Sequence, residues 1–440
     1  MQAMKWSILA LAVAAGTTQL AFADQQSESK GFVEDSKLNL LNRNYYFNRS
    51  AETQRSVNAD GDKVPHDGRN WSHGFILNYS SGFTQGTVGV GVDASGYLGL
   101  KLDGGAGHSN SGNLPIENDR SPADEYSFAN AAVKVRVSNT VLKYGYLQPT
   151  SPVFALGGSR LFPATGTGFM LTSEEIDKLF FEAGYFTDAR DGVNTFHNGS
   201  IGTSYSGAVA NSAAYAGGKY AFSDQFSASL YYAKLEDVWN QYYANANYVQ
   251  PLTANQSLTF DANYYYTKDT GSAKAGDISN NTYSLAAAYS VDAHTFTLGF
   301  QKVNGNTPFD YAAVAGTNGG GDGIFLANSI QYSDFNAPGE KSWQARYDLN
   351  MATLGVPGLS FMTRYVRGTG IEDSTNGFYG AYADGAEERE TNVEAKYILQ
   401  SGPAKNLSFR VRQTWHRGDA TTGGDVNEFR LITEYPLSIL

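Results

Sequence analysis

The sequence predicts an all-β protein, a transmembrane antiparallel β-barrel of 18 strands, and three observations support this prediction. Apolar and polar residues alternate over many short segments, as in strands with one face toward lipid and the other toward a polar lumen. The 440 residues include 48 Gly, 29 Tyr and 25 Phe but no Cys. Short turns alternate with longer connections, which is typical of outer-membrane barrels.

The N-terminal residues indicate export. Lys5 begins a positively charged region, Trp6 to Ala15 is mainly apolar, and Ala21-Phe22-Ala23 has the small-x-small pattern that signal peptidase reads. The apolar run is shorter than the roughly 20 residues that a membrane helix needs. We therefore expect residues 1–23 to be a signal peptide and residues 24–440 to form one barrel domain.

Strands are predicted wherever apolar or aromatic residues occupy alternate positions, most clearly in residues 407–417. The predicted strands are 38–47, 71–80, 87–100, 126–137, 140–146, 179–187, 193–205, 212–222, 226–235, 238–249, 257–266, 280–291, 295–303, 342–351, 359–367, 389–399, 407–417 and 425–439. The strand at 193–205 and the break near Glu236 are the weakest, so 16 strands are the alternative. A barrel of this size encloses an aqueous channel unless something fills it.

The segment from Leu147 to Asp177 interrupts the alternation. It contains three prolines and a Gly-Gly-Ser-Arg sequence that ends at Arg160. A loop of this length without a structural period calls for a functional reason. We expect it to be the third external loop, folded into the lumen so that Arg160 narrows the pore, and we expect Arg190-Asp191 to be one of the short turns.

Other classes of protein have little support. A net charge of -11 without a basic run argues against a nucleic-acid partner, and no repeat of about 40 residues indicates a propeller. The six histidines are scattered, and neither HExxH nor Gly-x-Ser-x-Gly occurs. We therefore expect no enzyme activity, metal or cofactor. An outer-membrane serine peptidase is the alternative from another class.

Long strings of the sequence carry a resemblance to a known family. They include GFVEDSKLNLLNRNYYFNR from Gly31, GGSRLFP from Gly157 and FLANSIQYSDFNAPGEKSWQARYDLN from Phe325. On these strings the chain resembles the OprD family, substrate-specific porins in the outer membrane of Gram-negative pseudomonads. The resemblance implies an 18-stranded barrel and passive uptake of small carboxylate-bearing nutrients: basic amino acids, small peptides containing them, and antibiotics that resemble them. The alternative within the family is a porin for aromatic or other organic acids.

The resemblance implies a row of basic side chains that guides the substrate carboxylate. By parity, Arg410, Arg412 and Arg430 point inward on the last two strands, and arginine suits the role because its guanidinium can bind a carboxylate with two parallel hydrogen bonds. The full basic row is Arg43, Arg160, Arg346, Arg364, Lys396, Arg410, Arg412 and Arg430. The parity of Arg43 is ambiguous. In the alternative interpretation these residues merely pair with Glu394, Glu428, Glu434 and Asp348.

The seventh external loop resembles the family segment on the acidic side of the constriction. The matching positions are Asp322, Ser329, Tyr332 and Asp334, with Tyr205 and Tyr311 as weaker matches. Opposed charges across a narrow gap orient a dipolar solute, and we expect Arg160 to face Asp334. The expected partners are a small molecule with a carboxylate and outer-membrane lipid, and the expected state is a monomer or a loose homotrimer.

Overall fold

The computed structural model describes residues 24–51, 55–57, 63–65, 68–108, 111–194, 196, 198–316, 321–374 and 376–440. The predicted signal peptide, residues 1–23, lies outside the described residues. Among the described residues, no helix combines the length and the apolar character needed to cross a membrane.

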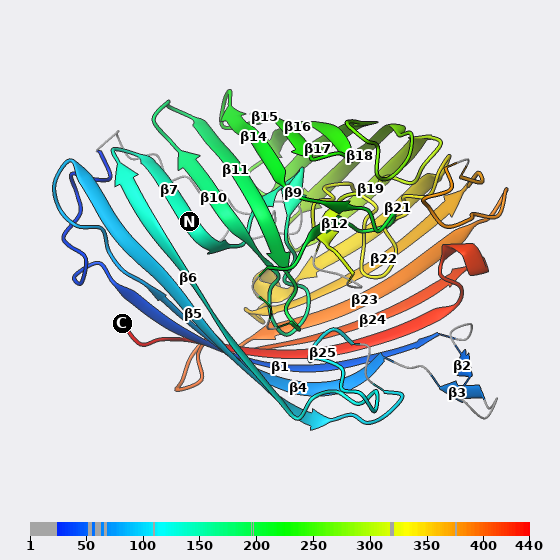
Figure 1. Ribbon diagram of the computed structural model, residues 1–440, viewed down its shortest axis with the longest axis horizontal. Coiled ribbons are helices and arrows are strands. Elements are labelled where there is room, and N and C mark those ends of the chain that lie inside the picture. Colours follow the sequence, from blue (N-terminus) through cyan, green and yellow to red (C-terminus); the bar gives the residue numbers. More distant parts are fainter. Residues whose placement is uncertain are drawn as a thin grey trace.

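Eighteen antiparallel strands of the described chain form a closed barrel (Figure 1), which confirms the predicted number. The strands are β1 (Lys37–Ala51), β4 (Gly68–Ser80), β5 (Val88–Asp103), β6 (Glu125–Val137), β7 (Thr140–Leu147), β10 (Thr165–Ser173), β11 (Leu179–Arg190), β14 (Ala213–Ala221), β15 (Phe226–Leu235), β16 (Trp239–Thr253), β17 (Gln256–Asp269), β18 (Ser279–Val291), β19 (His294–Gly305), β21 (Lys341–Asn350), β22 (Leu359–Thr369), β23 (Glu388–Ile398), β24 (Ser408–Gly418) and β25 (Val426–Ser438). Strand β1 pairs with both β4 and β25, which closes the sheet and leaves it without an edge.

The remaining elements lie in connections between the barrel strands. They are β2 (Arg55–Val57), β3 (Lys63–Pro65), β8 (Thr150–Ser151), β9 (Phe154–Ala155), β12 (Ile201–Thr203), β13 (Val209–Ala210), β20 (Ala312–Val314) and the 3₁₀ helices η1 (Met351–Leu354) and η2 (Ala420–Thr422). Strand β12 pairs with both β13 and β20, so two connections that are distant in sequence form one small sheet.

The total number of strands was predicted correctly, but one strand was misplaced. The strand predicted at 193–205 does not cross the barrel, and its place is taken by β10, which pairs with β7 and β11 inside the expected loop. Strand β10 was missed because Gly166 and Gly168 interrupt its alternation. A Cβ at Gly168 would lie only 2.1 Å from the carbonyl oxygen of Tyr185, so this position requires glycine.

The misplacement also changes two connections. The turn between β10 and β11 is residues 174–178, so Arg190-Asp191 is not a short turn but the start of a long loop. All three residues of β12 are buried, because this strand lies beneath other segments and has no lipid-facing side. The uncertain break near Glu236 is a real connection between β15 and β16.

The two rims of the barrel differ. One rim, here called the turn side, carries short connections such as 138–139, 254–255 and 292–293. The opposite rim carries the longer connections, among them loop 3 (148–164), loop 4 (191–212) and loop 7 (306–340). Strand β1 begins beside the end of β25, with Asn39 opposite Ser438, so both ends of the barrel sequence lie on the turn side.

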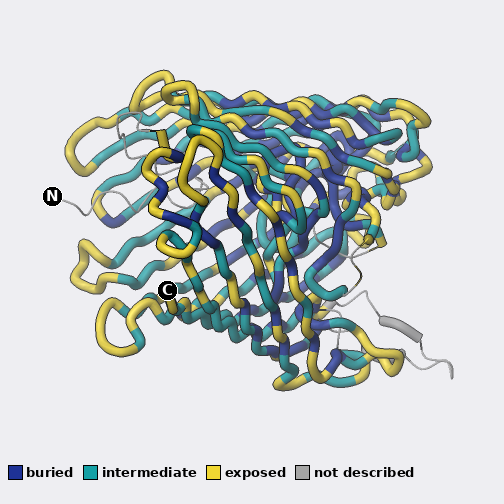
Figure 2. Tube along the Cα trace, turned by 60° about the vertical axis from the view of Figure 1, so that its left-hand side comes forward, coloured by how far each residue is buried: buried dark blue, intermediate teal, exposed yellow. Residues whose placement is uncertain are grey.

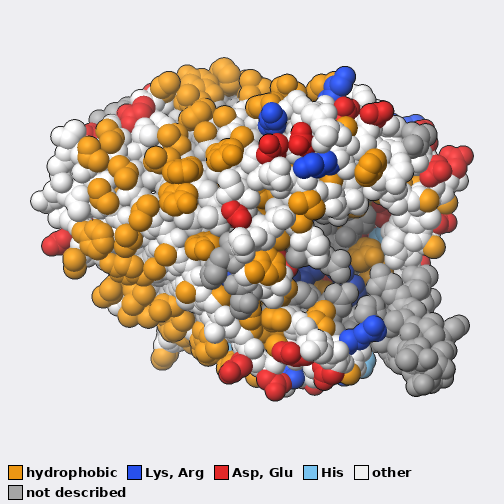
Figure 3. All heavy atoms as spheres, in the orientation of Figure 1, with side chains coloured by type: hydrophobic (Ala, Val, Ile, Leu, Met, Phe, Trp, Pro, Cys, Tyr) orange, Lys and Arg blue, Asp and Glu red, His pale blue; other side chains and the backbone are white. Residues whose placement is uncertain are grey.

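The outer face of the barrel is apolar. Burial alternates along the strands (Figure 2), and hydrophobic side chains cover a broad part of the face seen in Figure 3. Leu230, Leu298 and Trp343 are 70%, 68% and 65% exposed. Large apolar side chains on the outside of a closed sheet indicate a surface that is solvated by lipid.

Loop 3 folds into the lumen, as predicted. A Cβ at Gly74 on β4 would lie 2.9 Å from Leu161, and a Cβ at Gly99 on β5 would lie 2.9 Å from Phe162, so glycines in the wall make room for the loop. The Phe162 ring packs edge-on against Phe128, with 5.6 Å between the ring centroids. The barrel interior therefore contains a packed apolar anchor for the loop that bears Arg160.

Candidate functional site: the pore wall and its constriction

The strand register brings the predicted basic residues together on one part of the inner wall. Arg346 on β21 lies opposite Arg364 on β22, and Arg412 on β24 lies opposite Arg430 on β25. Lys396 on β23 lies opposite Arg410 on β24. Residues directly opposite each other in antiparallel strands point to the same face, so these pairs form a continuous basic stretch of the wall.

Carboxylates pair with much of this stretch. Arg346 donates two hydrogen bonds to Asp348, both 2.7 Å, and Arg410 and Arg412 both contact Oε2 of Glu394, at 2.7 and 3.1 Å. The alternative interpretation of the sequence, in which wall arginines pair with nearby acids, therefore describes part of the site.

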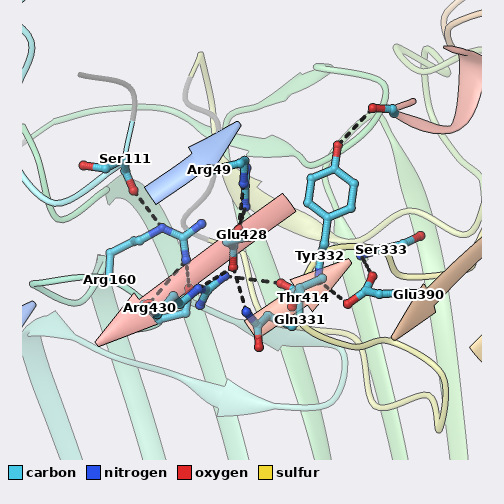
Figure 4. A network of polar contacts seen from close by, with 12 residues as sticks. Arg49, Ser111, Arg160, Gln331, Tyr332, Ser333, Glu390, Thr414, Glu428 and Arg430 are labelled. Carbon is cyan, nitrogen blue, oxygen red and sulfur yellow. Dashed lines mark hydrogen bonds and ion pairs between the residues drawn. The ribbon is translucent and has the colours of Figure 1, made fainter. Parts of the chain in front are cut away.

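The innermost basic cluster surrounds Glu428, which is fully buried (Figure 4). Its Oε1 accepts from Nε of Arg430 at 2.5 Å, and its Oε2 accepts from Nε of Arg49 at 2.7 Å. Gln331 of loop 7 also donates to Oε1, at 3.0 Å. Arg49 was missed because it lies at the far end of β1, beyond the predicted strand, and only the register shows that it adjoins Glu428.

The aromatic ring of Phe47 contacts three arginines of the same cluster. The guanidinium carbons of Arg160, Arg49 and Arg430 lie 5.0, 5.3 and 5.4 Å from the centroid of its ring. The negative face of an aromatic ring attracts cations at such distances. One ring and one carboxylate thus hold three like-charged groups close together.

Arg160 lies on the basic side of the pore. Its Nε donates to the Ser111 carbonyl oxygen at 2.8 Å, and its guanidinium forms no ion pair with a described carboxylate. Burial and, next in size, the neighbouring charge of Arg430 lower the pKa of Arg160 to about 10, which leaves it charged at neutral pH. Arg160 therefore belongs to the cluster around Phe47 and Glu428. That it faces Asp334 across the pore stays a prediction.

Arg43 holds loop 3 in place. Its side chain points inward, which resolves its ambiguous parity, and Nη1 donates to the carbonyl oxygens of Arg160 and Leu161 at 2.9 and 3.1 Å. Its Nε donates to Glu434 at 2.8 Å. Arg43 is therefore committed to the loop backbone, and its role in this structure is to position the constriction.

Two further predicted basic residues, like Arg160, have no described carboxylate partner. Nε of Arg364 donates to the amide oxygen of Asn392 at 2.9 Å, and neither Arg364 nor Lys396 forms an ion pair with a described residue. Together with Arg160, these side chains give the basic side more cations than counter-charges.

Four predicted residues of the acidic side meet at Asp334. Its Oδ2 accepts from the hydroxyls of Tyr205 and Tyr311 at 2.6 and 2.9 Å, and its Oδ1 accepts from the Ser329 hydroxyl at 2.6 Å. Burial and, after it, the charge of Asp334 raise the pKa of both tyrosines well above the usual value, so both phenols stay protonated and donate. No described cation pairs with Asp334.

The other two predicted residues of this group lie elsewhere. Tyr332 lies on the basic side, where its ring centroid is 5.0 Å from the guanidinium carbon of Arg49. Asp322 is exposed at the contact between loops 3 and 7, where its N–H donates to the Ala155 carbonyl oxygen at 3.1 Å.

Asp310 was missed by the sequence analysis. It is buried, and its carboxylate accepts from the backbone N–H groups of Tyr205, Ser206 and Tyr311 at 2.9, 3.0 and 2.8 Å. Asp310 thereby joins loop 7 to the part of loop 4 that carries Tyr205, a ligand of Asp334. No sequence pattern marks a carboxylate whose partners are backbone groups of a distant loop.

Comparisons with known proteins decide the family. Residues 30–439 match the family model described as outer membrane porin, OprD family. The chain belongs to the OprD family of outer-membrane porins. It is 58% identical to Porin D of Pseudomonas aeruginosa, with 100% of both chains covered.

Solved structures of OprD-family porins agree with the fold. The crystal structure of OprD from Pseudomonas aeruginosa matches with a TM-score of 0.81 and 54% identity, over 96% of this chain and 98% of that one. The structure of OpdK from the same organism with vanillate matches with a TM-score of 0.81 and 34% identity, over 93% of this chain and 100% of that one. This chain is thus a substrate-specific outer-membrane porin of Gram-negative bacteria, a channel and not an enzyme.

Proposed function

We propose that this porin passes basic amino acids, small peptides that contain them and antibiotics that resemble them. The substrate carboxylate binds the cations of the wall while the substrate cation binds Asp334. The observation that carries the proposal is the state of Asp334, a carboxylate whose described partners are three neutral hydroxyls. Neutral donors orient a carboxylate without cancelling its charge, so Asp334 remains an acceptor for a cation.

The carboxylate end of the substrate has several weak contacts available. Among the described residues, Lys396 and Arg364 have no carboxylate partner, and Arg160 adds a third charge without one at the constriction. Conduction requires a site that attracts a solute and also releases it. Several modest contacts along the wall meet that requirement better than one deep pocket.

The alternative within the family is a channel for aromatic or other organic acids. The related OpdK structure contains vanillate, and the basic wall of this porin offers contacts to any carboxylate. An acid without a cationic group cannot form an ion pair with Asp334, so its uptake should not depend on that carboxylate. The response to loss of Asp334 therefore separates the two candidate functions.

The proposal also includes the signal peptide and the state in which the barrel acts. We propose that residues 1–23 direct export and are removed. Because one chain encloses a complete pore, we propose that a single barrel transports solute, as a monomer or within a loose homotrimer, with lipid around its apolar face.

Liposome swelling with Asp334→Asn tests the proposal. Arginine, lysine, alanine and glutamate are compared in wild type, D334N and D348N, the last of which removes the same charge from the basic wall. D334N is expected to lower arginine and lysine uptake relative to alanine by about two- to fivefold, the range for one partly exposed ion pair. D348N should not lower that ratio. Equal loss of arginine and alanine in D334N would exclude Asp334 as the cation acceptor and favour the organic-acid alternative.

A further inference from the structure

Asp261 is a lumen-facing carboxylate on the turn side of the constriction. It lies on β17 with the same parity as Tyr265, whose hydroxyl donates to the Pro152 carbonyl oxygen of loop 3 at 3.0 Å. Asp261 is four residues closer to the 254–255 turn than Tyr265, which places it about 13 Å along the strand from this loop contact. Any solute that has passed loop 3 therefore still has to pass Asp261.

The described hydrogen-bond donors to Asp261 are all neutral amides. Asn245 and Asn247 donate to its Oδ2 at 3.0 and 3.1 Å, and Asn263 donates to its Oδ1 at 2.5 Å. No described Lys, Arg or His forms an ion pair with it. A carboxylate offers about four lone-pair positions, so at least one position of this half-buried group remains for a solute.

Asp261 lies on the same wall as the site of Asp334. Nε2 of Gln301 on β19 donates to the backbone carbonyl oxygen of Asp334 at 3.0 Å. Gln301 lies opposite Ser284, and Ser284 lies opposite Asn263, so Asn263 is two strands away, or about 10 Å. Asp261 is the next inward-facing position toward the turn side, about 7 Å further along the strand.

The basic wall also carries cations close to the turn side. Lys396 lies two residues before the end of β23, and Arg410 lies two residues after the start of β24, so both are close to the turn side. On the turn side of the constriction, the acidic part of the wall therefore still carries a carboxylate, and the basic part still carries cations. A dipolar solute can keep its orientation as it leaves loop 3.

We propose that Asp261 is a second acceptor for the cationic group of the substrate, which receives it after Asp334 on the turn side of the constriction. The inference rests on the proposed function and adds a step to it. A cation released from Asp334 still has to cross the turn-side part of the lumen, where Asp261 offers a carboxylate that pairs with no described cation. Asp261 lies about 12 Å along the wall from Gln301, the strand residue that binds the backbone of Asp334. A second acceptor at that place on the wall lowers the barrier to leaving Asp334.

Liposome swelling with Asp261→Asn tests the second acceptor, with arginine, alanine and glutamate as probes. The isosteric D261N variant should lower the ratio of arginine to alanine uptake by about two- to fivefold. Asp261→Glu keeps the charge and should retain most of the wild-type ratio. Migration of the unheated barrel in SDS gels confirms folding before each assay.

Glu182→Gln is the matched control. Glu182 lies on β11, its carboxylate is buried, and the hydroxyls of Tyr215 and Tyr231 donate to it at 3.3 and 3.0 Å. E182Q should leave the ratio unchanged. An unchanged ratio in folded D261N, or an equal fall in E182Q, would overturn the inference. D334N in the same assay reports on the proposed function separately, because it can lower the ratio whether or not D261N does.

Discussion

The two sides of the constriction hold their charges differently. On the basic side, Arg49 and Arg430 share the buried carboxylate of Glu428. On the acidic side, the described partners of Asp334 are the hydroxyls of Tyr205, Tyr311 and Ser329. Crowded cations need an opposite charge because an uncompensated buried charge is costly. A single carboxylate needs only hydrogen-bond donors, and these leave its charge available to a solute.

The largest expected effect is a loss of stability when the carboxylate of Glu428 is removed from the basic side. Glu428→Gln leaves Arg49 and Arg430 without their carboxylate, and breaking a buried pair costs about 3–5 kcal/mol. The free energy of unfolding, measured by denaturant titration in lipid, should fall by about 3 kcal/mol. Glu434→Gln is the control, since its pair with Arg43 is partly exposed. An equal loss in both variants would show that burial does not distinguish the two carboxylates.

The next effect concerns a wall cation that supports the loop. Arg43→Met removes two hydrogen bonds to the backbone of loop 3, each worth about 1.5–3 kcal/mol when the donor is charged. We expect loop 3 to move and single-channel conductance in planar bilayers to rise. Arg346→Met, which removes contacts to Asp348 on the wall, should leave the loop in place. The same conductance in R43M and wild type would contradict this role.

A smaller effect on uptake is expected from Lys396, a wall cation that pairs with no described carboxylate. Lys396→Gln should lower glutamate uptake about twofold, because a partly exposed charge contributes less than about 1 kcal/mol. Stability should stay at the wild-type value, whereas Arg410→Gln should lower it because Arg410 pairs with Glu394. Denaturant titration and liposome swelling of both variants check the contrast. A destabilised K396Q would show a structural partner for Lys396.

The smallest effect concerns the neutral donors at Asp334. The folded pKa of Tyr311 lies above the unfolded value near 10, so the buried neutral phenol stabilises the fold below that pH. The contribution is lost only as the pH rises from about 10 through the folded pKa. The difference in 295 nm absorbance between wild type and Tyr311→Phe should therefore show no titration around pH 10. A phenol that ionises there would mean that Asp334 is neutralised or distant.

The sequence alone determined the closed sheet and most of its strands. Alternation is a local property: every second side chain of a barrel strand meets lipid, and lipid requires apolar groups wherever the strand lies. That is why the segment around Phe409 and Val411 was predicted correctly. Resemblance to the OprD family supplied the residues around Asp334, which have no local pattern of their own.

Only the tertiary structure decided which segments form the barrel strands and which charged side chains pair with each other. Strand β10 is a barrel strand despite its glycines because Phe186 and the backbone of β11 occupy the space of their side chains. Arg49 and Glu428 are 379 positions apart in sequence, and the closure of β1 onto β25 makes them neighbours. Asp310 depends on backbone groups of loop 4. Such contacts follow from register and loop docking, which join distant parts of the chain and leave no local periodic signal.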